Sequence, residues 1–185
     1  MRTIQFSPVM RALAVCIGTL AFASGSYAAG DKTAYDSAKA SAKSTYEAAK
    51  AKCDAMSGNA KDICVAEAKA ARTRTDEQAE VAYKNTPKAR EHAVHEIAEA
   101  DYQVAKERCD DKTGNDKDVC VKEAKAAMTK VQADAKAAQK GTEARMDANK
   151  DKLDADYKVA AEKCDAMSGD AKDSCVKSAK ARYGK

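Results

Sequence analysis

The sequence predicts an all-α protein of three disulfide-pinned antiparallel helical hairpins in tandem, with about six helices. One observation is a cysteine motif, C-D-A-M-S-G-N-A-K-D-I-C in its first copy, that occurs three times with small changes. A second is that alanine and lysine, which favour helix, dominate the sequence around each copy. A third is the glycine followed by asparagine or aspartate at the centre of each copy, which favours a bend between two helices. The motif cysteines are Cys53, Cys64, Cys109, Cys120, Cys164 and Cys175.

The two cysteines of each copy are placed to close their own bend. Cys53 lies five residues before Gly58, and Cys64 lies five residues after Asn59, so the two cysteines face each other in an antiparallel hairpin. A disulfide needs a shorter Cα separation than helix axes usually keep, and neighbouring alanines permit that approach. We therefore predict disulfides 53–64, 109–120 and 164–175. Buried free thiols and a zinc site are the alternatives, although structural zinc ligands usually come in closer pairs such as C-x2-C.

Residues 1–28 have the pattern of a secretory signal peptide. A basic stretch, 1–11, precedes an apolar run, 12–23, which is too short to span a membrane. Ser26 and Ala28 fit the small residues of a cleavage site, so we predict cleavage after Ala28. This predicts an exported mature region, 29–185, with no integral membrane span after processing. An uncleaved anchor is the alternative. Export to an oxidising compartment agrees with the predicted disulfides.

The composition of the mature region limits both its core and its partners. Removing residues 1–28 leaves 157 residues with six cysteines, and with 31 basic against 29 acidic side chains. This near-balance, with both signs interspersed, argues against nucleic acid as a partner. Nine valines, two isoleucines and one leucine are too few for a sizeable core. Helix propensity and the disulfides must therefore supply most of the stability.

The order of the helices follows from the bends. The expected helices run approximately over 32–57, 60–84, 88–113, 116–140, 142–168 and 170–182. They form repeats of about 32–84, 88–140 and 142–185. The bend glycines should adopt the left-handed conformation at the end of the first helix of each hairpin. The next residue of each bend should cap the second helix; these caps are Asn59, Asn115 and Asp170.

The connections between the hairpins differ from one another. Thr86 should cap the third helix and Pro87 should occupy its first turn. Gly141 and Thr142 either separate two helices or form a flaw in one continuous helix. A continuous helix over 116–168 would span roughly 80 Å at the standard rise. The sequence leaves an elongated molecule and a loose bundle both open.

The candidates for chemistry are few. His92 and His95 are the only histidines; three residues apart on a helix, with Glu96 and Glu99 nearby, they would hold a transition metal weakly. The alternative is a solvated helix face. The sequence has no nucleophile elbow and no glycine-rich phosphate loop, and its cysteines lack the C-x-x-C spacing of thiol oxidoreductases. We therefore predict a protein that is not an enzyme, with no catalytic residues, no dedicated metal site and no cofactor.

The repeats K-C-D-A-M-S-G-N-A-K-D-I-C-V, R-C-D-D-K-T-G-N-D-K-D-V-C-V and E-K-C-D-A-M-S-G-D-A-K-D-S-C-V, with D-Y-K-V-A-A-E-K near the end, carry a resemblance. They resemble a family of small exported betaproteobacterial proteins, often labelled hypothetical or TolA-like cell envelope biogenesis protein. The resemblance covers essentially the whole mature chain and all three cysteine pairs. It implies a periplasmic location and no established activity, so it assigns no functional residue.

These observations lead to two functional hypotheses. The first is a non-enzymatic periplasmic protein that acts by structure or by interaction in the cell envelope, with a protein partner of unknown identity. The alternative is a stress-type periplasmic binder, either a holdase chaperone for unfolded clients or a weak metal buffer through His92 and His95. Alanine-lined helix faces can pair between chains as readily as within one, so self-association is also open.

Overall fold

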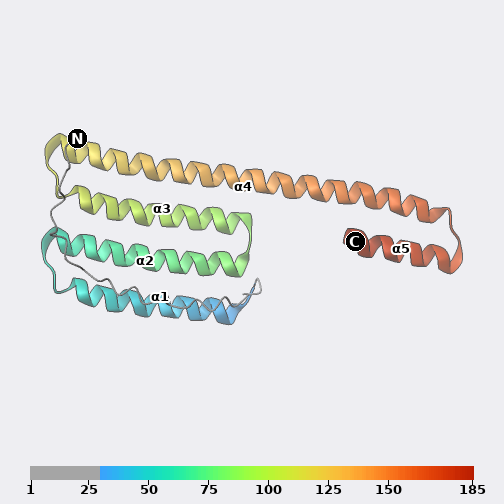
Figure 1. The fold of residues 1–185 in the computed structure, drawn as a ribbon, viewed down its shortest axis with the longest axis horizontal. Coiled ribbons are helices and arrows are strands. Elements are labelled where there is room, and N and C mark those ends of the chain that lie inside the picture. Colours follow the sequence, from blue (N-terminus) through green and yellow to red (C-terminus); the bar gives the residue numbers. More distant parts are fainter. Residues whose placement is uncertain (1–29) are drawn as a thin grey trace, which may run out of the picture.

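The computed structural model describes residues 30–185, so the predicted signal peptide and its cleavage site lie outside the described residues. Five helices follow one another in three hairpins (Figure 1). They are α1 (Lys32–Cys53), α2 (Gly58–Lys84), α3 (Pro87–Cys109), α4 (Gly114–Asp165) and α5 (Gly169–Tyr183). The described residues include no strand. The predicted all-α fold of tandem hairpins is confirmed, with five helices instead of about six.

The helices lie side by side in a single open layer. α1 packs against α2, α2 against α3, α3 against α4, and α4 against α5; among residues 30–185 no other pair of helices is in contact. Figure 1 shows that α5 lies on the same side of α4 as α3 does. Among the described helices, the layer therefore has two edges without a neighbour, one along α1 and one along the outer side of α4. No described helix covers either of its broad faces.

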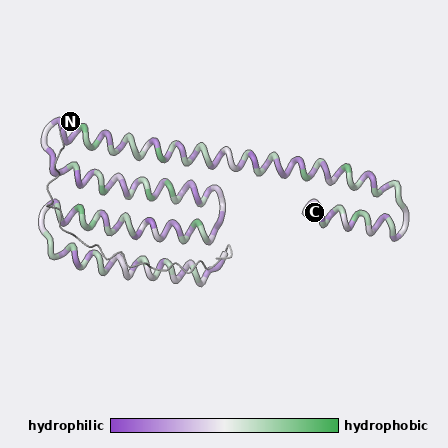
Figure 2. Tube along the Cα trace, in the orientation of Figure 1, coloured by the Kyte–Doolittle hydropathy of each residue, from purple (hydrophilic) through white to green (hydrophobic). Residues whose placement is uncertain are grey.

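Small side chains fill the contacts between the helices. Eight of the thirteen buried apolar residues are alanines, and Cys53, Cys109 and Cys164 are the largest fully buried side chains. Hydrophilic and hydrophobic residues alternate along every helix in Figure 2. No helix within the described range has the length and apolar character needed to cross a membrane. The layer thus depends on close alanine contacts and on the disulfides, as the composition predicts.

The helices end and begin at different residues from those expected at the bends. The first helix of each hairpin ends at or next to its cysteine, and the bend glycines begin the second helix with φ of +58°, +56° and +59°. The predicted left-handed conformation of the glycines is confirmed, but their predicted place at the end of the first helix and the predicted N-caps at Asn59, Asn115 and Asp170 are wrong. The N-cap residues are Ser57, Thr113 and Ser168. After each first cysteine the backbone tightens into a turn, in which the Met56 N–H donates to the Cys53 carbonyl oxygen at 2.9 Å, so the chain leaves the helix before the glycine.

Of the two possibilities left open at Gly141, the structure has the continuous helix, and α4 runs without interruption over 52 residues. At the standard rise this is about 78 Å, so the molecule is elongated. The Thr142 hydroxyl donates to the Ala138 carbonyl oxygen at 2.9 Å instead of capping a new helix. One helical glycine costs only about 1 kcal/mol relative to alanine. The helix does break between α2 and α3, where Pro87 follows the capping Thr86 and has no N–H to continue the helical hydrogen bonds. At the equivalent place in α4, Glu143 follows Thr142, and its N–H allows the helix to continue.

Enlarging a side chain between α2 and α3 should destabilise the layer. Ala70 is 3% exposed in this contact, so Ala70→Leu should lower the free energy of unfolding by about 1–3 kcal/mol through overpacking. Guanidinium unfolding followed by circular dichroism measures the change. Ala71→Leu is the matched control, because Ala71 is exposed on the same helix and its substitution should cost less than about 0.5 kcal/mol. Equal losses in the two variants would contradict this packing.

Candidate functional site

The three cysteine pairs form the most regular feature of the structure. Disulfides join Cys53 to Cys64, Cys109 to Cys120 and Cys164 to Cys175, with Cα separations of 5.6, 5.7 and 5.7 Å. The first cysteine of each pair is 1% exposed, and the second is half-buried. The pairs are those predicted from the sequence. Their place at the bends fixes the start of each hairpin covalently.

Each bend also carries an ion pair that the sequence analysis missed. The aspartate directly after the first cysteine meets the lysine three residues before the second cysteine. The nitrogen–oxygen distances are 3.0, 2.9 and 3.0 Å in the three bends. The pairs are Asp54–Lys61, Asp110–Lys117 and Asp165–Lys172. The shared C-D-x6-K spacing in all three motif copies was the signal that could have revealed them.

The ion pair at the first bend should be visible in a carboxylate titration. The hydrogen bond from Lys61, and then its positive charge, lower the pKa of Asp54 below its ordinary value. A lowered folded-state pKa stabilises the fold above the unfolded value of about 3.9, and this stabilisation is lost as pH falls through the folded pKa. We expect an NMR titration of the Asp54 carboxyl carbon to show a lowered midpoint that Lys61→Gln raises. An unchanged midpoint in that variant would contradict the pairing.

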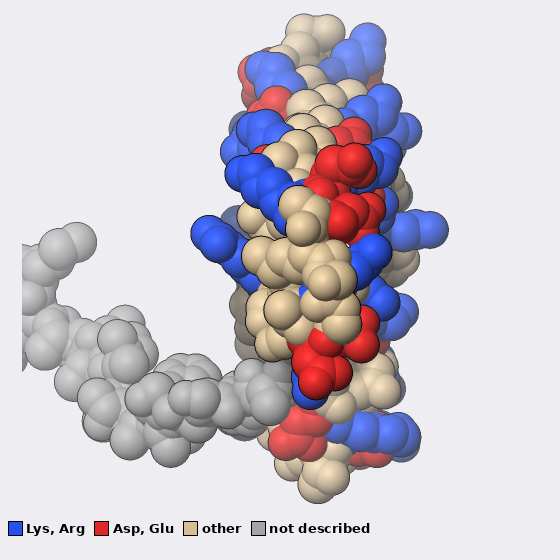
Figure 3. Space-filling model, turned by 90° about the vertical axis from the view of Figure 1, so that its right-hand side faces the viewer, with Lys and Arg blue, Asp and Glu red and all other residues tan. Residues whose placement is uncertain are grey.

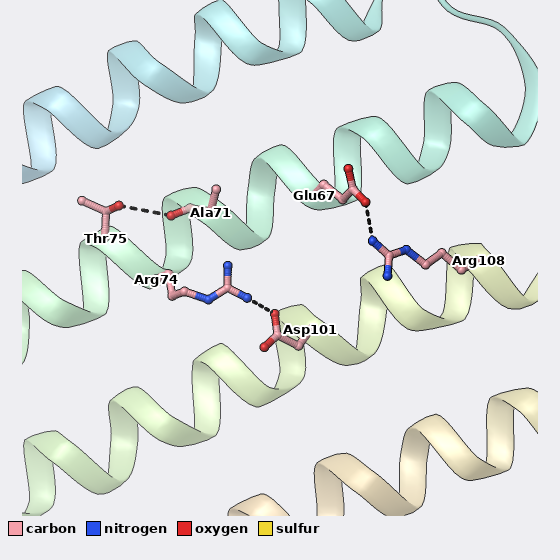
Figure 4. A network of polar contacts seen from close by, with 6 residues as sticks. All are labelled: Glu67, Ala71, Arg74, Thr75, Asp101 and Arg108. Atoms are coloured by element: carbon pink, nitrogen blue, oxygen red, sulfur yellow. Dashed lines mark hydrogen bonds and ion pairs between the residues drawn. The ribbon is translucent and has the colours of Figure 1, made fainter. Parts of the chain in front are cut away.

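Polar contacts link the first two hairpins across α2 and α3. The Asn59 amide donates to Asp111 at 2.6 Å, which joins the two neighbouring bends. Farther along, Arg108 donates to Glu67 at 2.6 Å, and Arg74 donates to Asp101 (Figure 4). These side chains are exposed, so each pair contributes little to stability, although together they fix the register between α2 and α3.

The two histidines lie on α3 but contact different carboxylates. His92 Nδ1 lies 3.3 Å from Glu77 on α2, and His95 Nδ1 lies 3.7 Å from Glu96 on its own helix. Their side chains are 62% and 50% exposed. In the part of the chain that the structure describes, no cluster of three metal-ligating side chains is present. The structure thus places His92 in a contact between hairpins that the sequence could not show.

An apolar groove runs between α3 and α4. Its first part has a volume of about 270 Å³, and Asp101 is the one charged residue among the described residues that line it. A second part of about 290 Å³ continues toward the start of α3 and shares Val94 with the first. Val94 is 37% exposed and Val131 is 46% exposed, whereas Met128 beneath them is 6% exposed. The groove therefore offers solvent-accessible apolar surface along two packed helices.

A second hollow, of about 880 Å³, lies mainly between α2 and α3 and has a mixed electrostatic character. Lysines and carboxylates both line it, among them Lys61, Lys69, Glu96 and Glu99. Basic and acidic side chains are likewise interspersed on the end of the molecule shown in Figure 3. Neither the hollow nor the end of the molecule in Figure 3 carries a surface patch that is only positive or only negative. Of these surfaces, the groove between α3 and α4 is the more selective for an apolar ligand.

The comparisons with known proteins give no relative. No family model, no curated protein and no solved structure matches this chain. Its function must therefore be argued from its own geometry.

Proposed function

We propose that this chain is an exported, non-enzymatic helical protein that acts by structure or interaction in the periplasm, as a component of the cell envelope. The observation that supports this most strongly is the open layer pinned by three disulfides. Disulfides form and persist in oxidising compartments such as the periplasm. The sequence of residues 1–28, with its signal-peptide pattern, supports export independently.

The shape of the molecule supports interaction as its role. The described helices form a single layer with two broad faces instead of enclosing a core. The α3–α4 groove adds exposed apolar side chains to one of these surfaces. Exposed apolar patches rimmed by polar residues are typical of interaction sites. A rigid, covalently pinned scaffold suits this role because binding would order little of the chain.

Intact mass and peptide mapping of the protein from its native envelope fraction test this proposal. We expect the mass of residues 29–185 less six hydrogens, recovered in the periplasmic fraction, with all six motif cysteines linked within their bends. A retained leader or free thiols would overturn the exported scaffold. A purified protein with a catalytic turnover that one point substitution abolishes would overturn the non-enzymatic part.

A second candidate function is a holdase for unfolded clients, which the α3–α4 groove specifically favours. Unfolded chains expose apolar segments, and Val94 and Val131 offer accessible apolar surface to them. We expect the mature protein to suppress light scattering from a heat-denatured client, and Val94→Asp to weaken this suppression severalfold. Leu153→Asp is the matched control, since Leu153 is 47% exposed but lies outside the groove. Equal loss in both variants, or no suppression by the unchanged protein, would remove this candidate.

A further inference from the structure

The continuous helix α4 contains the equivalents of two helices that pack against each other elsewhere in the chain. A shift of 56 residues places Cys64 of α2 on Cys120, and a shift of 55 residues places Cys109 of α3 on Cys164. The first half of α4 is therefore the repeat of α2, and its second half is the repeat of α3. α2 and α3 pack side by side, whereas the two halves of α4 lie end to end. The two halves of α4 therefore do not make the contact that their equivalents, α2 and α3, make with each other.

The contact between α2 and α3 has a defined set of residues. Small side chains are buried in it: Ala70 at 3% exposure, Ala89 at 6%, Ala93 at 5% and Val104 at 9%. Two ion pairs lie on either side of Ala70 and Val104, one between Arg74 and Asp101 and one between Glu67 and Arg108 (Figure 4).

The same residue types recur at the equivalent positions of α4, where they are exposed. Ala126, Ala144, Ala148 and Val159 correspond to the four buried residues, and Val159 is 56% exposed. Their separations of 18, 4 and 11 residues are close to whole numbers of helical turns, so they lie along one line. Met128 is buried against α3 and Cys164 against α5, and both lie about half a turn from this line. The line therefore forms the outer edge of α4, with Val159 also bordering the hollow between α4 and α5.

The flanking charges recur as well. Lys130 and Asp156 stand at the positions of Arg74 and Asp101, with the same signs. Glu123 and Lys163 stand at the positions of Glu67 and Arg108. All four α4 side chains are exposed. The contact between His92 and Glu77 is not repeated, because Asp147 and Ala133 occupy its equivalent positions.

We propose that a second copy of this chain packs antiparallel along the outer edge of α4 and reproduces the α2–α3 contact twice. In this dimer the first half of each α4 lies against the second half of the other, about a twofold axis near Glu143. Lys130 pairs with the partner's Asp156, and Glu123 pairs with the partner's Lys163. Symmetry forms each of these pairs twice. The two layers join edge to edge through α4.

A second copy is the occupant that the geometry favours. Within one chain, the two halves of α4 can meet only if the helix breaks near Gly141 and folds back, and the structure has an unbroken helix there. In a straight α4 the two halves follow each other along one edge. An antiparallel second copy then places its second half against the first half of this chain, and its first half against the second. This inference does not depend on the proposed function, because it concerns the assembly of the chain alone.

Zero-length crosslinking of isotope-mixed chains tests the proposal. Mature protein in ¹⁴N and ¹⁵N forms is mixed by dilution, reconcentrated and treated with a carbodiimide, which joins lysines to paired carboxylates. We expect crosslinks between Lys130 and Asp156, and between Glu123 and Lys163, that include mixed-isotope pairs. The Lys61–Asp54 crosslink is the intrachain control, and it should show no mixed pairs. Crosslinks at the two α4 pairs without mixed isotopes would indicate a folded-back chain and overturn the dimer.

Sedimentation equilibrium with charge-reversal variants provides an independent measurement. Asp156→Lys places like charges together twice in the dimer and should weaken dimerisation about tenfold. Adding Lys130→Asp to this variant should restore the original dissociation constant. Lys136→Asp is the control, because Lys136 is exposed on α4 away from the outer-edge line, and the variant should dimerise normally. A monomer at all concentrations, or no rescue by the double reversal, would overturn the proposal.

Discussion

Replacing Cys109 and Cys120 together by alanine should lower the free energy of unfolding by about 3 kcal/mol, the loop-closure value for a disulfide that closes a loop of this size. This disulfide closes the bend between α3 and α4, and Asp111 in the same bend binds Asn59 of the first hairpin. The alanine contacts of the layer provide little other stabilisation to offset the loss. We expect guanidinium unfolding to shift accordingly, and the melting temperature to fall by about 6–12 °C.

The third disulfide provides the comparison for this variant. α5 has 15 residues and, among the described helices, packs only against α4; an isolated helix of this length is marginal in water. Replacing Cys164 and Cys175 by alanine should therefore remove hydrogen-exchange protection from α5 while α1 to α3 keep theirs. The Cys109 and Cys120 variant should instead lose protection on both sides of its bend. Identical protection patterns in the two variants would contradict this division of the fold.

The features that the sequence predicted correctly are those set by covalent geometry and by local repetition. Two cysteines placed symmetrically about a glycine face each other in a helical hairpin, so the bends and the three pairings followed from spacing and helix propensity. The left-handed conformation of Gly58 and its equivalents followed for the same reason. Thr86 also caps α3 as predicted, because Pro87 leaves the chain few alternatives there. In each case a local constraint outweighs the tertiary environment.

The features that the sequence could not give depend on which helices become neighbours. The α3–α4 groove exists because Val94 and Val131 come from helices that pack in an open layer instead of a closed bundle. The pair between His92 and Glu77 likewise depends on the register between two hairpins. The predicted helix ends at the bends were wrong because the chain tightens into a turn directly after Cys53, before the bend glycine, and residue types alone do not place that turn. The sequence alone does not assign a role to Asp156 and Lys163, because that role depends on the contacts that Asp101 and Arg108 make between α2 and α3.

Substitutions at Gly141 should distinguish a continuous, straight α4 from a helix that bends at Gly141. Gly141→Ala replaces a poor helix former where the added Cβ meets only the Arg145 side chain at 3.7 Å, an ordinary contact. We expect it to stabilise α4 by about 0.5–1 kcal/mol and to leave the maximum dimension of the monomer unchanged in small-angle X-ray scattering. Gly141→Pro removes one backbone hydrogen bond and clashes with the preceding turn, at a cost of about 3 kcal/mol or more. It should kink α4 and shorten that dimension.

The pair of variants decides what the glycine contributes. If α4 is straight in solution, alanine preserves the shape of the unchanged protein and proline alters it. If Gly141→Ala instead lengthened the molecule, the unchanged chain would already bend at Gly141, and the continuous helix would be wrong. In such a bend Gly141 would end one helix and Thr142 would cap the next, as Asn85 ends α2 and Thr86 caps α3. The two halves of α4 could then pack within one chain, so the shape of this helix determines whether its outer edge is left for a second copy.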